Sequence, residues 1–290
     1  MKLMKLIKSV IVLTSVSFVC AAEAAQTSQV IPYYGDDFYN ALKAGAANED
    51  LQADLKTVLR SFHVLQNGKN DALVSNCQGQ GPCYGHRAIG YDAARVFLMG
   101  KYYLVPSGTG YAIRDVYCDK DLTSRDFRGQ GPSPGKVPDN RVINIEHTWP
   151  QSRFTRKFSK EAQKSDLHHL FPTDSEVNAI RGNNLFGEVT KDLVELKCSA
   201  SRFGIGSAGS DDVFEPPQDH KGNVARALFY FSIRYDVAID PREESVLRKW
   251  NREDPVDADE VRRNNEIFKV QGNRNPFVDF PELAEKIADF

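Results

Sequence analysis

Two short polar stretches hold the residues of this chain that are best suited to chemistry. The first, residues 141–150, places a carboxylate beside an imidazole, as Glu146 and His147, at the end of a short β-type run. The second, residues 166–183, contains the carboxamide of Asn178 and the cation of Arg181. An oxygen ligand, a base of tunable pKa, a carboxamide and a cation are what metal-assisted phosphodiester hydrolysis requires. These two stretches therefore form the candidate active site.

Three of these residues have distinct roles in such chemistry. Mg²⁺ prefers oxygen ligands and keeps most of its waters, so Glu146 would supply a charged oxygen and Asn178 a neutral one. His147 titrates near neutral pH and would take a proton from an attacking water. A Glu-His pair alone is weak evidence, and the alternative is a surface or hydrogen-bonded histidine. Neighbours in a strand point to opposite faces, but we expect the Trp149-Pro150 turn to break the alternation, so that both side chains border one cleft.

The surrounding pattern predicts the elements that must position these side chains. Residues 142–146 have β character and end at a turn over residues 148–150. Thr173 and Glu176 match a capping box, which predicts a helix over residues 174–181 that ends at Gly182. Asn178 and Arg181 are three positions apart and would share one face of that helix.

The rest of the chain predicts mostly helices. We expect strands over residues 111–117 and 187–198, and a loop rich in glycine and proline over residues 124–139. The expected helices cover residues 38–64 with a break near Gly45, 91–99, 220–235, 242–252, 257–270 and 281–288. The predicted fold class is α+β: one mostly helical domain around a small β element in the middle of the chain.

The first 24 residues have the pattern of a secretory signal peptide. A start with three lysines precedes an apolar stretch, residues 9–20, which is too short to span a bilayer, and residues 22–24 offer an A-x-A cleavage site. The alternative is a lipoprotein signal with Cys20 lipidated, although Val19 is bulkier than such processing usually accepts. We expect a domain over residues 25–290 that is periplasmic or secreted and does not enter the membrane after the leader is removed.

The four remaining cysteines are Cys77, Cys83, Cys118 and Cys198, an even number in an oxidising compartment. Four cysteines allow three disulfide connectivities. Because Cys77 and Cys83 flank a short loop that can close on itself, we favour Cys77–Cys83 with Cys118–Cys198. A zinc site is the alternative, but no C-x-x-C pair is present.

The charge balance excludes a uniformly basic protein that coats nucleic acid. The chain has 37 Lys and Arg against 39 Asp and Glu, a formal net charge of −2. Binding to a polyanion would therefore depend on a local patch. Arg153, Arg156, Lys157, Lys160 and Lys164 lie between the two halves of the candidate site and would follow phosphates there; the alternative is an ordinary solvated face.

Several segments, taken in order, resemble the bacterial endonuclease I family. They are Ile-Glu-His-Thr-Trp-Pro at 145–150, Ser-Asp-Leu-His-His-Leu-Phe-Pro at 165–172, Glu-Val-Asn-Ala-Ile-Arg-Gly-Asn at 176–183, and residues 215–235 and 271–279. The resemblance covers most of the chain from about Tyr34 onward. It implies an exported nuclease with a ββα-metal (His-Me finger) core embedded in helices.

The resemblance also implies roles for individual residues. His147 would be the general base, with Glu146 and Asn178 as the protein ligands of one Mg²⁺ ion. Members of the family cut DNA, and often RNA, through backbone phosphates without sequence preference and leave 5′-phosphates; we expect a monomer. A family arginine that contacts the cleaved phosphate lies in a cysteine-containing insertion that this chain lacks. Arg153, Arg156 or Arg181 would fill that role, and Lys157 would add a substrate contact.

Asp166, His168 and His169 lie close to these motifs and need a separate interpretation. We expect Asp166 and His168 to orient the site or pack beneath it, because the family does not use the two histidines as Mg²⁺ ligands. One alternative is a zinc hydrolase that uses His147, His168 and His169, although no H-E-x-x-H motif is present. A second is an exported nucleic-acid-binding protein with a degenerate site.

Overall fold

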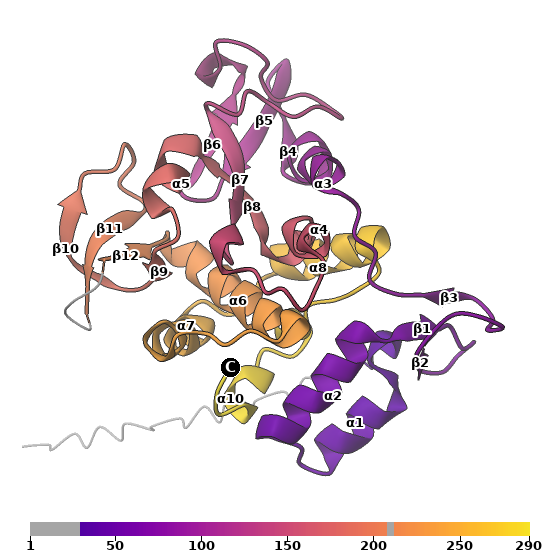
Figure 1. Ribbon diagram of the computed structural model, residues 1–290. Coiled ribbons are helices and arrows are strands. Elements are labelled where there is room, and N and C mark those ends of the chain that lie inside the picture. Colours follow the sequence, from indigo (N-terminus) through magenta and orange to yellow (C-terminus); the bar gives the residue numbers. More distant parts are fainter. Residues whose placement is uncertain (1–29, 208–211) are drawn as a thin grey trace, which may run out of the picture. The chain divides into compact units, whose positions relative to one another are not determined.

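A pair of antiparallel strands and the helix that follows them lie in the middle of the chain. Strand β7 (Ile143–His147) pairs with β8 (Leu170–Asp174), in a register that runs from Ile143 opposite Asp174 to His147 opposite Leu170. Helix α5 (Ser175–Arg181) follows β8 directly and contacts both strands. Figure 1 shows β7 and β8 side by side, with α5 next to them.

The computed structural model describes residues 30–207 and 212–290. Pro32–Phe290 forms one compact unit, and Met1–Ile31, of which only the last two residues are described, is a separate one. The expected signal peptide, residues 1–24, and the start of the mature domain lie outside the described residues. Within the described ranges, no helix is both long and apolar enough to cross a bilayer.

Three further sheets surround the central pair. One has the order β2-β1-β3, one is the meander β4-β5-β6, and one has the order β10-β11-β12-β9 with only the β12–β9 pair parallel. Their strands are β1 (Phe62–Val64), β2 (Ala72–Val74), β3 (Cys83–Tyr84), β4 (Leu104–Ser107), β5 (Gly110–Asp115), β6 (Lys120–Thr123), β9 (Leu185–Phe186), β10 (Val189–Val194), β11 (Arg202–Gly206) and β12 (Asp212–Glu215).

Helix α6 (Lys221–Tyr235) is buried on nearly every side and packs against helices from both ends of the chain. A helix that is apolar or internally paired all round belongs in a core. The other helices are α1 (Gly35–Lys43), α2 (Asn48–Arg60), α3 (Tyr91–Phe97), which continues as a π-helical turn (Leu98–Tyr102), α4 (Lys160–Lys164), α7 (Pro241–Glu253), α8 (Ala258–Gln271), α9 (Pro276–Asp279) and α10 (Leu283–Lys286).

The α+β class is confirmed, but the β structure is not confined to the middle of the chain. The expected helices and the two expected strands are present with shifted ends. The missed strands are two to five residues long, and two of the pairings, β1 with β3 and β9 with β12, join strands that are not consecutive in sequence. Strands this short lack a clear alternation, so the sequence pattern does not mark them.

Both expected disulfides are confirmed. Cys77–Cys83 closes the loop between β2 and β3, and Cys118–Cys198 joins the segment after β5 to the segment after β10. The second bridge lies near the central unit, because Lys197 is ion-paired with Asp174 at the start of α5.

Candidate active site

Glu146 and Arg181 form a buried ion pair between β7 and α5. Arg181 Nη1 donates to Glu146 Oε1 at 2.6 Å and to the main-chain oxygen of His147 at 3.1 Å, while Nη2 donates to the oxygen of Thr148 at 2.8 Å. Glu146 is 3% exposed and Arg181 is 1% exposed. Burial raises the pKa of the Glu146 carboxyl, and the Arg181 guanidinium opposes that rise. Arg181 thus fixes both the carboxylate and the end of the strand that presents it.

Asn178 contacts the same face of β7 one helical turn earlier. Its Nδ2 donates to Asn144 Oδ1 at 2.7 Å. Asn144 and Glu146 are two positions apart in the strand and therefore lie on the same face of it. Asn178 and Arg181 are three positions apart in α5 and share one face of the helix, as expected. Because the Asn178 nitrogen is held by Asn144, its amide oxygen is left to accept another partner. A carboxylate and an amide oxygen on one face are the donor set that suits Mg²⁺, so these residues fit such an ion.

Helix α5 begins at a different cap from the one predicted. Asp174, rather than Thr173, is the N-cap: its Oδ1 accepts from the backbone N–H groups of Glu176 and Val177 at 2.9 and 3.1 Å. Thr173 instead belongs to β8, opposite Asn144. Both residue types favour the N-cap, and both pair with β7, but Asp174 is the last residue of β8 and directly precedes the helix. The predicted end at Gly182 is confirmed, with a φ of 55°.

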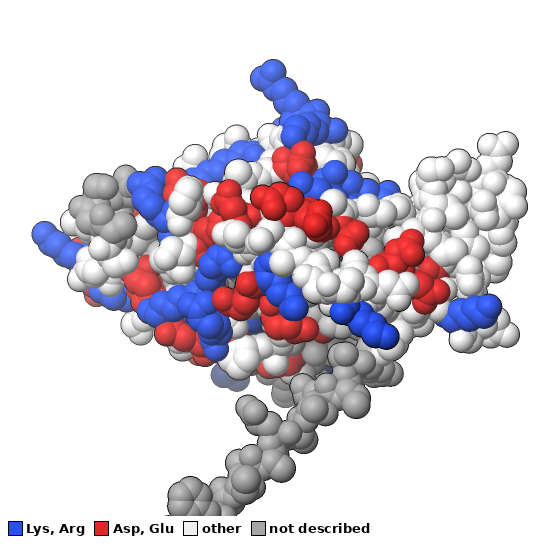
Figure 2. Space-filling model, turned by 90° about the horizontal axis from the view of Figure 1, so that it is seen from below, with Lys and Arg blue, Asp and Glu red and all other residues white. Residues whose placement is uncertain are grey.

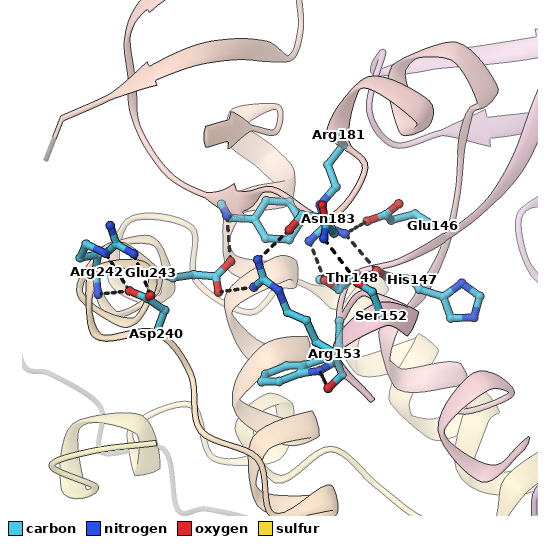
Figure 3. Close-up of polar contacts among 12 residues, drawn as sticks. Glu146, His147, Thr148, Ser152, Arg153, Arg181, Asn183, Asp240, Arg242 and Glu243 are labelled. Atoms are coloured by element: carbon cyan, nitrogen blue, oxygen red, sulfur yellow. Dashed lines mark hydrogen bonds and ion pairs between the residues drawn. The ribbon is translucent and has the colours of Figure 1, made fainter. Parts of the chain in front are cut away.

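His147 extends to the other side of β7. The strand pairs through His147, so the alternation is not broken before the turn, and the expectation that the turn would do so is wrong. Its face of the strand also carries Ile143 and Ile145, which belong to the buried apolar cluster. Figure 3 shows the Glu146 and His147 side chains leaving the strand in different directions.

The hydrogen bonds of His147 define its protonation. Nε2 lies 3.1 Å from the main-chain oxygen of Lys164. Since a carbonyl oxygen only accepts, Nε2 carries the proton and Nδ1 has the free lone pair. Burial lowers the pKa of His147 to about 3, and the charges of Lys164 and Arg181 act in the same direction. The ring is therefore neutral at pH 7, with Nδ1 facing the Gln151 amide nitrogen at 3.4 Å.

Asp166 lies at the centre of a buried network that joins distant parts of the fold. Its Oδ1 accepts from Gln271 Nε2 at 2.7 Å, and its Oδ2 accepts from the hydroxyls of Tyr230 and Tyr235 at 2.7 and 2.8 Å. Burial acts to raise the pKa of this carboxyl, but nearby histidines and the Gln271 hydrogen bond hold it well below its usual range. Asp166 holds the segment after α4 against α6 and α8, and in the described part of the chain it forms no hydrogen bond or ion pair with Glu146 or His147.

The two adjacent histidines are structural in this arrangement. His168 Nε2 lies 3.3 Å from the main-chain oxygen of Asn273, and His169 Nε2 lies 2.8 Å from that of Gln163. With His147 on the Lys164 oxygen, each of the three rings uses Nε2 on a carbonyl. Within the described ranges they do not converge as a metal-ligand group, so the zinc alternative has no geometric support.

Asp115, Cys118 and Asp174 do lie close enough together to suggest a metal site. However, Cys118 is in a disulfide, and Asp115 Oδ1 already accepts from the backbone N–H groups of Tyr117, Cys118 and Asp174. Asp174 caps α5 and pairs with Lys197. This group therefore organises the backbone behind the candidate site rather than binding an ion.

The basic residues between the two halves of the site differ in what holds them. Arg153 Nη2 donates to the main-chain oxygen of Asn183 at 2.6 Å, and Nη1 lies 3.8 Å from Glu243 Oε2. Lys157 pairs with Asp236 at 2.6 Å. Arg156 is exposed and has no hydrogen bond or ion pair with any other described residue. On the face in Figure 2, acidic and basic side chains are interspersed, in keeping with the balanced composition.

Sequence reasoning missed three residues that contact the candidate site. Asn144 orients Asn178, Gln151 faces the free nitrogen of His147, and the Tyr117 hydroxyl lies beside Glu146 without the geometry of a hydrogen bond. Only Asn144 had a local signal, because it precedes Glu146 by two positions in a predicted strand.

A histidine, a buried carboxylate and a carboxamide on a strand–strand–helix unit are residue types that phosphodiester hydrolysis can use. Comparison with known proteins agrees. The model of the family described as Endonuclease I matches residues 107–282, more than half of the chain. The chain belongs to the Endonuclease I family.

The relatives of this chain include a ribonuclease and a deoxyribonuclease. The chain is 35% identical to an extracellular ribonuclease of Bacillus subtilis (strain 168), over 57% of this chain and 60% of that protein. It is 32% identical to a periplasmic deoxyribonuclease of Aeromonas hydrophila, over 68% of this chain and 89% of that protein. The chain thus spans less than two thirds of the length of the Bacillus relative.

Proposed function

We propose that this protein is an exported endonuclease that depends on a divalent metal ion and hydrolyses the phosphodiester backbone of DNA and RNA. The observation that carries the proposal is the contact between His147 Nε2 and the Lys164 carbonyl, which leaves Nδ1 of that ring as the proton acceptor. Membership of the Endonuclease I family, and relatives named as extracellular or periplasmic nucleases, support the activity and the export.

The β7–β8–α5 unit would be the metal core. Glu146 and Asn178 would hold one Mg²⁺ ion, which would offset the negative charge that develops at the phosphate and the leaving oxygen. Arg181 orients the Glu146 carboxylate and opposes the rise in its pKa that burial causes. Asn144 turns the Asn178 amide so that its oxygen is available.

His147 would act as the general base. Its Nδ1 would accept a proton from the attacking water, while the Lys164 carbonyl fixes the ring and stabilises the imidazolium that results. Gln151 donates toward Nδ1 at the long distance of 3.4 Å, so this contact yields readily to a water or substrate oxygen. Arg153, Arg156 and Lys157 would contact backbone phosphates, which carry no sequence information.

Cleavage of a supercoiled plasmid by wild type and by His147→Ala, with Mg²⁺ and with EDTA, tests the proposal. We expect Mg²⁺-dependent nicking by wild type and a loss of at least 100-fold in the variant, on the order of a general-base contribution. Added imidazole should restore part of the variant's activity, which a merely misfolded protein would not show. Equal cleavage by wild type and variant would remove His147 from the mechanism.

A further inference from the structure

An open cavity of about 850 Å³ adjoins the candidate active site. Its walls come from the turn after β7, the segment after α5, the loop between α6 and α7, and the start of α7. They include Trp149, Arg153, Asn183, Leu185, Ala238 and Ile239, with Asp240, Arg242 and Glu243. Figure 3 shows Arg153 between Glu243 and Asn183, on the side toward Arg181 and Glu146.

Hydrogen bonds connect this cavity to the residues of the site. Asn184 Nδ2, on the cavity wall, donates to the main-chain oxygen of Arg181 at 2.9 Å. Arg181 in turn binds Glu146 at 2.6 Å. The Arg181 guanidinium also acts on the buried Glu243 carboxyl and lowers its pKa against the larger effect of burial. One arginine therefore lies between the candidate catalytic carboxylate and the acidic wall of the cavity.

Both arginines of the cavity wall lie in ion pairs, and Asp212 adds a further, exposed carboxylate to the wall. Arg153 lies 3.8 Å from Glu243, and Arg242 lies 2.9 Å from Asp240. A phosphate needs uncompensated positive charge, and the cavity wall as a whole carries three carboxylates against two guanidinium groups. A neutral planar group with donors and acceptors on its edge fits them better. Nucleobases are such groups, and carboxylate, amide and guanidinium side chains are the ones that bind their edges.

Two further features suit a base. The half-buried Leu185 and the exposed Ala238 give the cavity an apolar part, to which Trp149 and Ile239, at 5% and 3% exposed, add little surface. Asn183 is exposed, and its amide nitrogen has only a 3.5 Å contact with Ser152 Oγ, so it is available to a ligand. A base inside a duplex is stacked and paired, and it would have to be extruded to enter, at a cost in free energy.

We infer that this cavity receives an unpaired nucleobase flanking the phosphate to be cut, so that the protein cleaves single strands in preference to duplex. The inference rests on the proposed nuclease function and adds a strand preference to it. Single-stranded DNA and RNA share the base chemistry, and separate substrates distinguish them.

Ala238→Trp is the most direct perturbation, because Ala238 is exposed, lines the cavity and would fill it without removing a polar contact. Ala53→Trp, at an exposed alanine of α2 outside the cavity, is the matched control. Fluorescent single-stranded DNA, single-stranded RNA and duplex DNA of equal length would be the substrates. Cleavage would be measured as kcat/KM, and binding by anisotropy in EDTA.

We expect wild type to prefer single strands, and Ala238→Trp to lower single-strand kcat/KM and affinity by about tenfold, the scale of one stacked base. Asn183→Ala should act in the same direction, and Ala53→Trp should change neither quantity. If Ala238→Trp leaves the single-strand to duplex ratio unchanged while plasmid is still cut, the subsite is refuted and the nuclease stands. If wild type cuts nothing, the proposed function fails, and the anisotropy comparison still decides whether the cavity binds single strands.

Discussion

Replacement of Arg181 by methionine is the most informative change to the interior of the candidate site. The side chain makes three hydrogen bonds, one of them to the Glu146 carboxylate, and both residues are almost fully buried. Removing one partner of a buried ion pair leaves an uncompensated charge and costs about 3–5 kcal/mol. We therefore expect Arg181→Met to lower the free energy of unfolding by about 4 kcal/mol at pH 8.

The stability loss caused by Arg181→Met should depend on pH, and the direction of that dependence follows from the pKa of Glu146. Burial raises the pKa of Glu146 in the folded state above its unfolded value, and loss of Arg181 would raise it further. The folded state then binds more protons than the unfolded state between the two values, so stability falls as pH rises through that window. The penalty of Arg181→Met should accordingly be smaller at pH 5 than at pH 8.

Urea unfolding in EDTA, at both pH values, measures these quantities. A double-mutant cycle with Glu146→Gln should give a coupling energy of about 2 kcal/mol or more, because the double variant leaves no buried charge unpaired. A cost below about 1 kcal/mol that does not change with pH, or strictly additive variants, would show that the pair does not stabilise the fold in this way.

Three more outcomes follow from the structure. Arg156→Ala should leave the urea midpoint unchanged and reduce the salt dependence of DNA binding by about one phosphate contact, which a titration of affinity against salt would detect. Replacing Cys118 and Cys198 by serine should lower the free energy of unfolding by about 4 kcal/mol, and replacing Cys77 and Cys83 by about 2 kcal/mol. The difference arises because Cys118–Cys198 closes a far longer loop than Cys77–Cys83, and calorimetry would show which variant is less stable. Burial lowers the pKa of four buried histidines in and around the site to about 3 or 4, so their contribution to stability is complete above pH 6.5 and is lost as pH falls toward those values. Each of these histidines should lower the free energy of unfolding by roughly 1 kcal/mol for every unit that the pH falls within that window. Urea unfolding at pH 7, 6 and 5 would measure the total loss.

Local patterns predicted the frame of the candidate site well. The capping-box pattern and Gly182 placed the helix over residues 174–181 to within one residue, although Asp174 and not Thr173 is its N-cap, because helix ends depend on neighbours in sequence. The shared face of Asn178 and Arg181 followed from helical geometry alone. Both disulfides could be favoured because one pair of cysteines flanks a short loop.

Long-range contacts were beyond that reasoning. Asp166 is satisfied by Tyr230, Tyr235 and Gln271, which lie 64 to 105 positions away. Nothing near Asp166 in sequence shows that these side chains converge on it. The same holds for His147, whose protonation is set by the main-chain oxygen of Lys164, 17 positions later. A carbonyl has no sequence signature, so the state of the base could be read only from the fold.

The choice among the three arginines illustrates the difference between what local sequence patterns predict and what long-range contacts decide. The family resemblance implied an arginine that contacts the cleaved phosphate, and the sequence left Arg153, Arg156 and Arg181 as equal candidates for it. Hydrogen-bond accounting separates them: Arg181 is committed to a carboxylate and two carbonyls, Arg153 is held loosely by Asn183 and Glu243, and Arg156 is held by no described residue. A charge already neutralised inside the protein has little left for a substrate, whereas an exposed, unpaired guanidinium gains most from a phosphate. On this argument Arg181 serves Glu146, and a substrate phosphate would be met first by Arg156 and then by Arg153.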